Sequence, residues 1–263
     1  MSTEPKIIDP FSCHSLYLEM STLGRSLGNG TGFVVKKNDL FYLITNWHAV
    51  HGRSAETLQP LHSSMALPDQ MTIVFHRKDA LGSWVLAQFS LIRPNGQPGW
   101  LEHSRGHEID VVAIPLDSLV STEQIKYYDL DLALGDVDMV PECAMSASII
   151  GFPRGKTSAG YFPIWKTGHV ASDYDLDYGG TPCFLIDATV REGMSGSPVF
   201  LRSSNFKKKD GSRELLVGPP QVRFLGVYSG RIEELSEIGR VWKPETIHEI
   251  IDHGVTPPNP LSE

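Results

Sequence analysis

The sequence has few cysteines. Cys13, Cys143 and Cys183 are its three, and no two of them form a CxxC pair. Widely separated cysteines of this kind argue against a zinc knuckle or a thioredoxin-like redox site. An odd and low number is typical of a reducing compartment, where disulfides are rare. We therefore expect no disulfide or zinc site to hold the fold together, and the length of 263 residues suffices for the chain to fold around its own hydrophobic core.

Long apolar runs and an excess of basic charge are also absent. No run approaches the roughly 18 apolar residues of a membrane-spanning helix, and residues 1–6 (MSTEPK) lack the features of a secretory signal. Lys and Arg total 23 against 31 Asp and Glu, which gives a net charge of −8, whereas nucleic-acid surfaces are usually basic. We expect a soluble cytoplasmic protein without a membrane or nucleic-acid partner, although a local basic groove is compatible with this charge.

Helical periodicity is scarce and is clear only near the end of the chain. Pro244 suits the first turn of a helix. Ile247, Ile250 and Ile251 follow with the spacing of one helical face, and a glycine comes soon after. The pattern predicts a C-terminal helix over residues 244–253.

Short β-rich runs separated by turns are what the sequence has in quantity. Its 24 glycines and 18 prolines are a mild excess over usual composition and indicate many turns. The runs rich in Val, Ile and Phe cover residues 32–35, 40–45, 71–76, 84–92, 110–116, 147–152, 164–171, 184–190, 198–202 and 222–228. Frequent short runs of this type predict an all-β barrel or sandwich.

Three connecting segments have distinct compositions. Residues 129–138 are acidic and suit a linker between two halves. Residues 203–220 are polar and include three consecutive lysines, so a solvated loop is expected there, with a binding patch as the alternative. Residues 151–157 (GFPRGKT) are similar to a phosphate-binding loop but have one residue too few between the glycines, so they predict a turn.

Three other segments together carry chemistry. His48 follows a β-rich run, Asp110 opens an apolar run, and Ser195 lies in a glycine-rich turn. A serine hydroxyl needs a base to become a nucleophile, and histidine serves at neutral pH. A carboxylate orients the imidazole, and backbone N–H groups in a tight turn stabilise an oxyanion. Glu108 and Asp117 are alternative carboxylates.

The segments around these residues resemble the trypsin/chymotrypsin-type serine peptidases, and more narrowly the bacterial trypsin-like peptidase domains related to HtrA and the glutamyl endopeptidases. Residues 30–35 (GTGFVV) are similar to the G-[ST]-G strand before the histidine, and residues 45–50 (TNWHAV) match the histidine motif. Residues 110–114 (DVVAI) approximate the aspartate motif, with one extra apolar residue. Residues 193–198 (GMSGSP) match G-x-S-G-[GS]-P. The resemblance covers roughly residues 12–235.

The resemblance implies an all-β fold of two antiparallel six-stranded β-barrels with the active site between them. A single peptidase domain would then span residues 1–263. Its first barrel would cover about 12–128 and its second about 140–235, and the predicted helix at 244–253 would follow.

The resemblance also implies roles for individual residues. Ser195 would be the nucleophile, His48 the general base and Asp110 the residue that orients His48, with Ser197 as the alternative serine. The backbone amides of Gly193 and Ser195 would form the oxyanion hole. The implied activity is that of a serine endopeptidase acting on proteins or peptides, which requires no metal or organic cofactor.

Residues 225–230 (LGVYSG) are similar to the family strand that pairs with the substrate backbone. Ser229 falls where a family hydroxyl supports the catalytic carboxylate, and Gly230 follows it. Val190 and Tyr228 stand where glutamyl endopeptidases have a threonine and a histidine, so that specificity does not transfer. Together they indicate a smaller, apolar first pocket.

Two further departures bear on regulation and specificity. Met194 replaces the aspartate that pairs with a new N-terminus in zymogens, so activation by N-terminal cleavage is not expected. Thr189 replaces the acidic residue behind specificity for basic side chains. A protease that lacks zymogen control needs either a narrow substrate specificity or a regulator, and the sequence identifies neither. The sequence also gives no indication of the oligomeric state. The alternatives are a regulated or inactive peptide-binding module and an esterase with the same triad.

Overall fold

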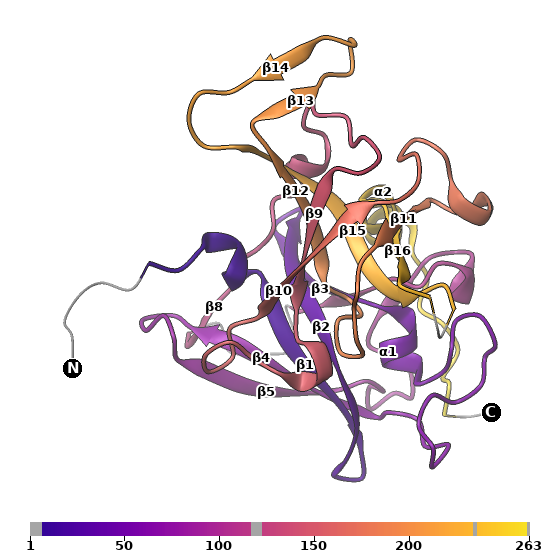
Figure 1. Cartoon of the computed structure of the whole chain (residues 1–263). Helices are drawn as coiled ribbons and strands as arrows, with labels where there is room; N and C mark the ends of the chain where they lie inside the picture. Colours follow the sequence, from indigo (N-terminus) through magenta and orange to yellow (C-terminus); the bar gives the residue numbers. More distant parts are fainter. Residues whose placement is uncertain (1–6, 117–122, 234–235, 262–263) are drawn as a thin grey trace.

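The computed structural model describes residues 7–116, 123–233 and 236–261, and the chain is mostly β-structure (Figure 1). The first half contains β1 (Ser15–Thr22), β2 (Arg25–Lys37), β3 (Leu40–Thr45), β4 (Gln70–Arg77), β5 (Trp84–Ser90), β6 (Leu101–Glu102), β7 (Val112–Pro115) and β8 (Ile125–Lys126). The second half contains β9 (Ser146–Gly151), β10 (Ile164–Val170), β11 (Cys183–Asp187), β12 (Pro198–Ser203), β13 (Asn205–Lys207), β14 (Arg213–Leu215), β15 (Gln221–Arg231) and β16 (Ile238–Trp242). The helices are α1 (Trp47–His51) and α2 (Glu245–His253), with 3₁₀ turns η1 (Pro10–Cys13), η2 (Gly106–Glu108), η3 (Leu132–Gly135), η4 (Pro153–Gly155) and η5 (Tyr178–Gly180).

The second half forms a closed six-stranded barrel, in agreement with the prediction for this part of the chain. Its strands follow the order β10-β11-β16-β15-β12-β9, and all pairs are antiparallel. The register shifts between Val199 and Phe200 on β12 and between Tyr228 and Gly230 on β15. Such irregularities bend strands and re-aim side chains, and both lie close in sequence to predicted site residues.

The first half differs from the predicted six-stranded barrel. Its strands form an eight-stranded antiparallel sheet in the order β5-β4-β1-β2-β3-β7-β6, with β8 paired to β4, and the described pairing does not close into a ring. The two ends of this order nevertheless approach each other, because the chain that follows β5 pairs with the chain that precedes β6. The Gly99 N–H donates to the Leu91 carbonyl at 2.8 Å, and the Arg93 N–H donates to the Gln97 carbonyl at 2.8 Å. Beyond them, the backbone of Glu102 on β6 exchanges hydrogen bonds of 3.0 and 2.9 Å with Val255.

The hairpin of β2 and β3 shows why apolar runs in this chain become strands. Asn38 and Asp39 both have positive φ, which a two-residue hairpin turn requires. On one face of the sheet Val34 lies in the core of the first half, whereas Phe33 and Val35 face a second core. Both faces of the hairpin are therefore buried, which accounts for its nearly continuous apolar sequence.

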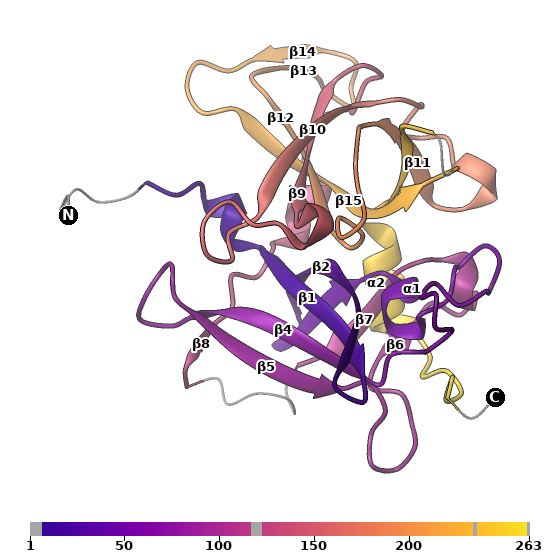
Figure 2. The same ribbon diagram turned by 60° about the horizontal axis from the view of Figure 1, so that its bottom comes forward.

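The two halves lie against each other, with α2 beside their junction (Figure 2). One apolar cluster draws on both, since it contains Phe33 from β2, Phe224 from β15 and Ile247 and Ile250 from α2. The helix lies where the sequence predicts one, and these two isoleucines are fully buried. No helix within the described ranges is long and apolar enough to cross a membrane.

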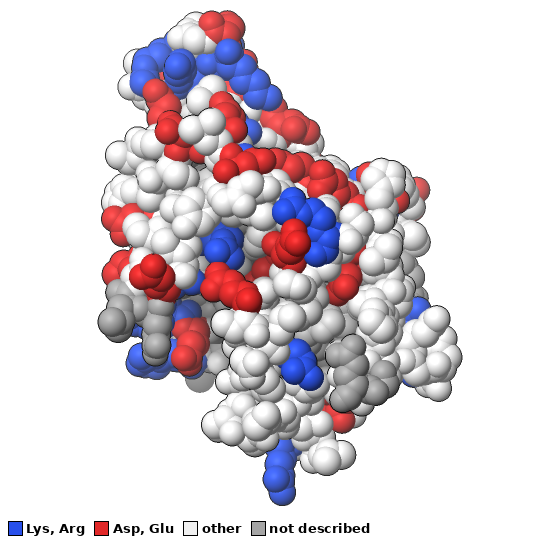
Figure 3. Space-filling model, turned by 90° about the vertical axis from the view of Figure 1, so that its right-hand side faces the viewer, with Lys and Arg blue, Asp and Glu red and all other residues white. Residues whose placement is uncertain are grey.

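Residues 203–220 were expected to form a solvated loop, but they contain the hairpin of β13 and β14. The hairpin projects at the top of Figure 1, and its lysines and arginines form the blue group at the top of Figure 3. Acidic side chains lie among them, and Lys208 is 3.8 Å from Asp138 and 3.6 Å from Glu214. These neighbours offset the basic charge that the sequence alone suggested as a binding patch.

Candidate active site

Helix α1 places His48 at the junction of the two halves. It follows β3 directly, with Asn46 at its N-cap, and ends at Gly52, whose positive φ suits a helix C-terminus. The Asn46 side chain donates a hydrogen bond of 2.6 Å to the backbone carbonyl of Asp110. The start of the helix is thereby tied to the segment that enters β7.

The Asp110 carboxylate holds His48 through two of its atoms. Oδ2 accepts a hydrogen bond of 2.7 Å from the His48 Nδ1, and Oδ1 accepts one of 2.9 Å from the His48 backbone N–H. Ser229 Oγ donates a third, of 2.8 Å, to Oδ2. The carboxylate is buried and fixed from three directions, so the imidazole carries its proton on Nδ1 and leaves Nε2 to act as a base.

The environment of His48 acts on its pKa in two opposing directions. Burial disfavours the charged imidazole and lowers the pKa, whereas the negative charge of Asp110 and its hydrogen bond raise it. The net result is a pKa above the ordinary value of 6.5. Once neutral, an imidazole whose pKa is raised is a stronger base towards a hydroxyl proton.

Ser195 lies in a turn whose glycines have conformations that other residues rarely adopt. Gly193 and Gly196 have φ of +87° and +84°. A Cβ at Gly196 would collide with the backbone carbonyl of Thr31. The Thr31 N–H donates to the Ser195 carbonyl at 2.9 Å, and the Gly196 N–H donates to the Tyr228 carbonyl at 2.8 Å. The turn is therefore fixed from β2 on one side and β15 on the other.

The carbonyls of this turn all have partners that orient its N–H groups. Glu192 O accepts from the Arg154 N–H at 2.6 Å, and Met194 O accepts from the Ser197 N–H at 3.0 Å. In a trans peptide the N–H points opposite to the carbonyl, so the N–H groups of Gly193 and Ser195 point away from the donors Arg154 and Ser197. Within the described ranges neither donates a hydrogen bond to the protein.

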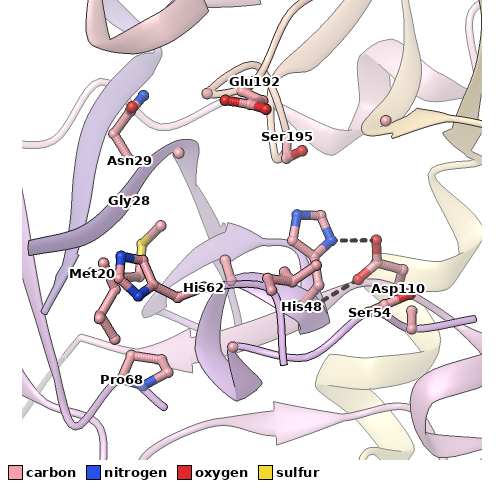
Figure 4. A pocket seen from close by; sticks show the side chains of 18 of the residues that line it. Met20, Gly28, Asn29, His48, Ser54, His62, Pro68, Asp110, Glu192 and Ser195 are labelled. Atoms are coloured by element: carbon pink, nitrogen blue, oxygen red, sulfur yellow. Dashed lines mark hydrogen bonds and ion pairs between the residues drawn. The ribbon is translucent and has the colours of Figure 1, made fainter. Parts of the chain in front are cut away.

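Ser195 and His48 face one cavity from opposite sides (Figure 4). Among the described residues no hydrogen bond joins the Ser195 hydroxyl to His48. Such bonds are often long without substrate and tighten in the reacting complex. The cavity measures about 540 Å³. It is lined by Met20, Leu27, Gly28, Asn29, Gly30, His48, Ala49, Gly52, Ser54, Ala55, Glu56, Leu61, His62, Ser63, Ala66, Pro68, Asp110, Glu192, Gly193, Ser195, Ser229, Gly230, Arg231 and Arg240.

Two residues expected to bind substrate lie elsewhere. Val190 and Tyr228 are buried in the apolar core of the barrel and are not among the residues that line the cavity. Burial raises the pKa of Tyr228 above its usual range, so its hydroxyl stays neutral. Ser229 and Gly230, in contrast, both line the cavity. Because Val190 and Tyr228 do not line this cavity, their predicted contribution to a first substrate pocket stays a prediction.

The residues considered as alternatives for the catalytic aspartate and serine do not line the cavity where the structure describes them. Glu108 is exposed at the surface and accepts a hydrogen bond of 2.9 Å from Arg105. Ser197 is fully buried and its hydroxyl has no partner within the described ranges. Asp117 lies outside the described residues.

Sequence reasoning missed residues that support the site. Thr31 Oγ1 donates to the Gly193 carbonyl at 2.8 Å and accepts from the Phe152 N–H at 3.2 Å. Glu102 accepts a hydrogen bond of 2.8 Å from the Trp47 indole N–H and lies 3.2 Å from His51 Nε2. Thr31 lies inside a motif noted in the sequence, but nothing local distinguishes Glu102. In the described part of the chain, no group of three or more His, Cys, Asp or Glu side chains could hold a metal ion.

The geometry invites comparison with known proteins. The sequence model of the Trypsin-like peptidase domain family matches residues 30–206. The chain belongs to this family. A comparison with curated proteins finds no match.

Solved structures of serine proteases share the fold of this trypsin-like peptidase domain. The active form of the Rv3671c protease from M. tuberculosis superposes with a TM-score of 0.52 at 15% identity, covering 94% of this chain and 84% of that one. The serine endoprotease from Yersinia pestis gives a TM-score of 0.52 at 11% identity, covering 92% of this chain and 62% of that one. This chain thus spans less than two thirds of the Yersinia protein. At these identities the likeness concerns the fold alone.

Proposed function

We propose that this trypsin-like peptidase domain is a serine endopeptidase that hydrolyses peptide bonds through an acyl-enzyme. The observation that carries the proposal is the hydrogen-bonded pair of Asp110 and His48, which lines one cavity with Ser195. The N–H groups of Gly193 and Ser195 at the same cavity have no acceptor within the described part of the chain, which supports the proposal further.

The reaction follows from these positions. Ser195 Oγ attacks the scissile carbonyl carbon while His48 Nε2 takes the hydroxyl proton. The N–H groups of Gly193 and Ser195 stabilise the negative oxygen of the tetrahedral intermediate. His48 then gives its proton to the leaving amine, and the C–N bond breaks. Water, deprotonated by His48, attacks the acyl-enzyme and releases the acid and free Ser195. Asp110 orients His48 and stabilises its charged form throughout.

A fluorophosphonate probe tests the nucleophile. We expect stoichiometric labelling of the wild type, located at Ser195 by mass spectrometry of proteolytic peptides, and none in Ser195→Ala. Ser197→Ala serves as the matched control, because its hydroxyl is buried two residues away. A folded wild type that is not labelled, or labelling that survives in Ser195→Ala, would contradict the proposal.

A regulated enzyme or peptide-binding module is the second candidate. It is favoured by the absence of a hydrogen bond between Ser195 and His48 in the described residues, since a bound peptide would have to bring the two together. A peptide library separates the two functions. Cleavage without any added factor supports the endopeptidase, whereas saturable binding without cleavage supports the module. Rates on matched ester and amide substrates distinguish a peptidase from an esterase.

A further inference from the structure

The charged residues of the active-site cavity are unevenly distributed. Apart from Asp110, the charged residues that line it are Glu56, Glu192, Arg231 and Arg240. Arg231 and Arg240 come from β15 and β16, and Arg240 Nη2 lies 3.0 Å from Glu56 Oε1. The Arg240–Glu56 pair and Arg231 thus place charge where the cavity meets the barrel strands next to Ser229, whereas Glu192 lies beside Ser195 (Figure 4).

The rest of the lining is uncharged and largely apolar. It comes from the end of β1, the start of β2, helix α1 and the segment 52–68 that follows the helix. It includes Met20, Asn29, Gly30, Ala49, Leu61 and Pro68. Met20 is almost fully buried at this end, whereas Leu61 is 56% exposed at the cavity. Ligand pockets are lined predominantly by apolar side chains, and Met20 and Leu61 give this end of the cavity that character.

The chemistry of His48 indicates which part of a substrate meets this uncharged end. Nδ1 faces Asp110, so Nε2 points to the other side of the ring (Figure 4). Met20, Asn29 and Pro68 lie on that side in the same view, opposite Asp110. The leaving amine takes its proton from Nε2, so the residue that carries this amine lies closest to the uncharged end.

The backbone at Gly30 keeps this end open. A Cβ at that position would lie 3.5 Å from Met20 Cε and 3.6 Å from the Ser195 carbonyl oxygen. These are ordinary contacts, so an alanine fits, but any larger side chain would project into the space between Met20 and Ser195. Ala49, next to His48, is also small. The space beside the nucleophile is therefore available to a side chain of the substrate.

We propose that this uncharged end is a specificity pocket for a large apolar side chain on the residue whose amine leaves, the first after the scissile bond. The inference rests on the proposed function, because it requires an acyl-enzyme at Ser195. It places a selection for apolar side chains on the leaving-group side of the bond.

Acyl transfer isolates this pocket from the rest of the substrate. The full chain is acylated with p-nitrophenyl acetate, which releases p-nitrophenol and leaves acetyl-Ser195. An amino-acid amide then competes with water: its nitrogen bonds to the acetyl carbon, the Ser195 ester bond breaks, and the amine proton returns to Oγ through His48. Leucinamide, phenylalaninamide, glycinamide and lysinamide are compared as nucleophiles. The ratio of acetylated amide to acetate measures capture, with Ser195→Ala as the background.

We expect leucinamide and phenylalaninamide to capture the acetyl group at least about tenfold better than glycinamide, the discrimination that an apolar pocket provides. Gly30→Val, whose side chain would project into the space between Met20 and Ser195, should reduce capture by phenylalaninamide most. Leu61→Asp, at an exposed position that tolerates the change, should reduce capture by both apolar amides and increase capture by lysinamide. Leu58→Asp is the matched control, because Leu58 is 42% exposed on the same segment and does not line the cavity.

The outcomes separate the two proposals. A p-nitrophenol burst followed by equal capture of all four amides would overturn the pocket and leave the serine nucleophile intact. Equal effects of Leu61→Asp and Leu58→Asp would also overturn it. A folded wild type without a burst would overturn the proposed function, and the pocket with it.

Discussion

At the scale of single residues, Asp110 decides the charge state of His48. Burial lowers the pKa of His48, and the carboxylate more than compensates, so the net pKa is above 6.5. Only the neutral imidazole accepts the serine proton. Activity is therefore lost as pH falls through this raised pKa, and we expect the acid limb of the kcat/KM profile to lie above pH 6.5.

Asp110→Asn removes the charge and leaves the burial, so the acid limb should move to lower pH. The asparagine no longer holds the reactive tautomer, and we expect kcat/KM on the plateau to fall by about 10⁴-fold. Profiles from pH 5 to 9 on one peptide substrate measure both effects. Ser229→Ala is the control, because it removes a hydrogen bond but keeps the charge, and its limb should stay above 6.5. If the acid limb of the kcat/KM profile stayed at the same pH in Asp110→Asn, a group other than His48 would be responsible for the loss of activity at low pH.

Short sequence motifs predict the proposed catalytic residues but not the residues that hold them in place. His48, Asp110 and Ser195 each lie in a short motif, and all three line one cavity. The contact of Thr31 with Gly193 joins positions 162 apart, and no local pattern indicates it. Motifs identify residues whose type the chemistry restricts, whereas such supports depend on which strands the fold brings together.

At the scale of elements, helix α1 depends on its surroundings. Its five residues are too few for a helix to be stable alone. Trp47 stacks on His51 at 3.8 Å, and both contact the buried carboxylate of Glu102 on β6. His48 lies on the same helix, so this contact should affect both stability and catalysis.

We expect Glu102→Ala to reduce the free energy of unfolding by about 1–3 kcal/mol, since it leaves the buried Trp47 N–H without an acceptor. It should also slow fluorophosphonate labelling, because α1 carries His48. Glu102→Gln keeps an oxygen that can accept from Trp47, so its losses should be smaller in both measurements. Urea denaturation and labelling rates provide the test. A Glu102→Ala variant with wild-type stability and labelling would rule out this role.

The sequence predicted strands and helices correctly where their apolar residues form a clear pattern. It missed an element whose apolar pattern is interrupted and whose position depends on pairing with distant strands. The apolar run at residues 40–45 coincides with β3, and α2 lies where its isoleucines predicted it. The sequence did not reveal β16, because Gly239 and Arg240 interrupt its apolar character. Its position comes from antiparallel pairing with β11 and β15, which only the assembled barrel provides.

At the scale of the whole molecule, the two halves are connected by a common core. The cluster around Phe224 includes side chains from β2, β3, β12, β15, β16 and α2. Phe224 is fully buried, and its ring lies 5.7 Å from the rings of both Phe33 and Phe200. Since Phe33 belongs to the first half and Phe200 to the second, neither half keeps its packing if the other unfolds.

This common core predicts a single cooperative unfolding transition. Phe224→Ala should reduce the free energy of unfolding by about 3–5 kcal/mol through loss of burial and the cavity left behind. Hydrogen exchange in increasing urea, followed on peptides from β3 and from β12, should then show both halves losing protection together. Leu23→Ala, at a position 90% exposed on the β1–β2 hairpin, should leave stability unchanged. If the β12 peptides exchanged while the β3 peptides stayed protected, the halves would be independent, and the cleft between them could open without global unfolding.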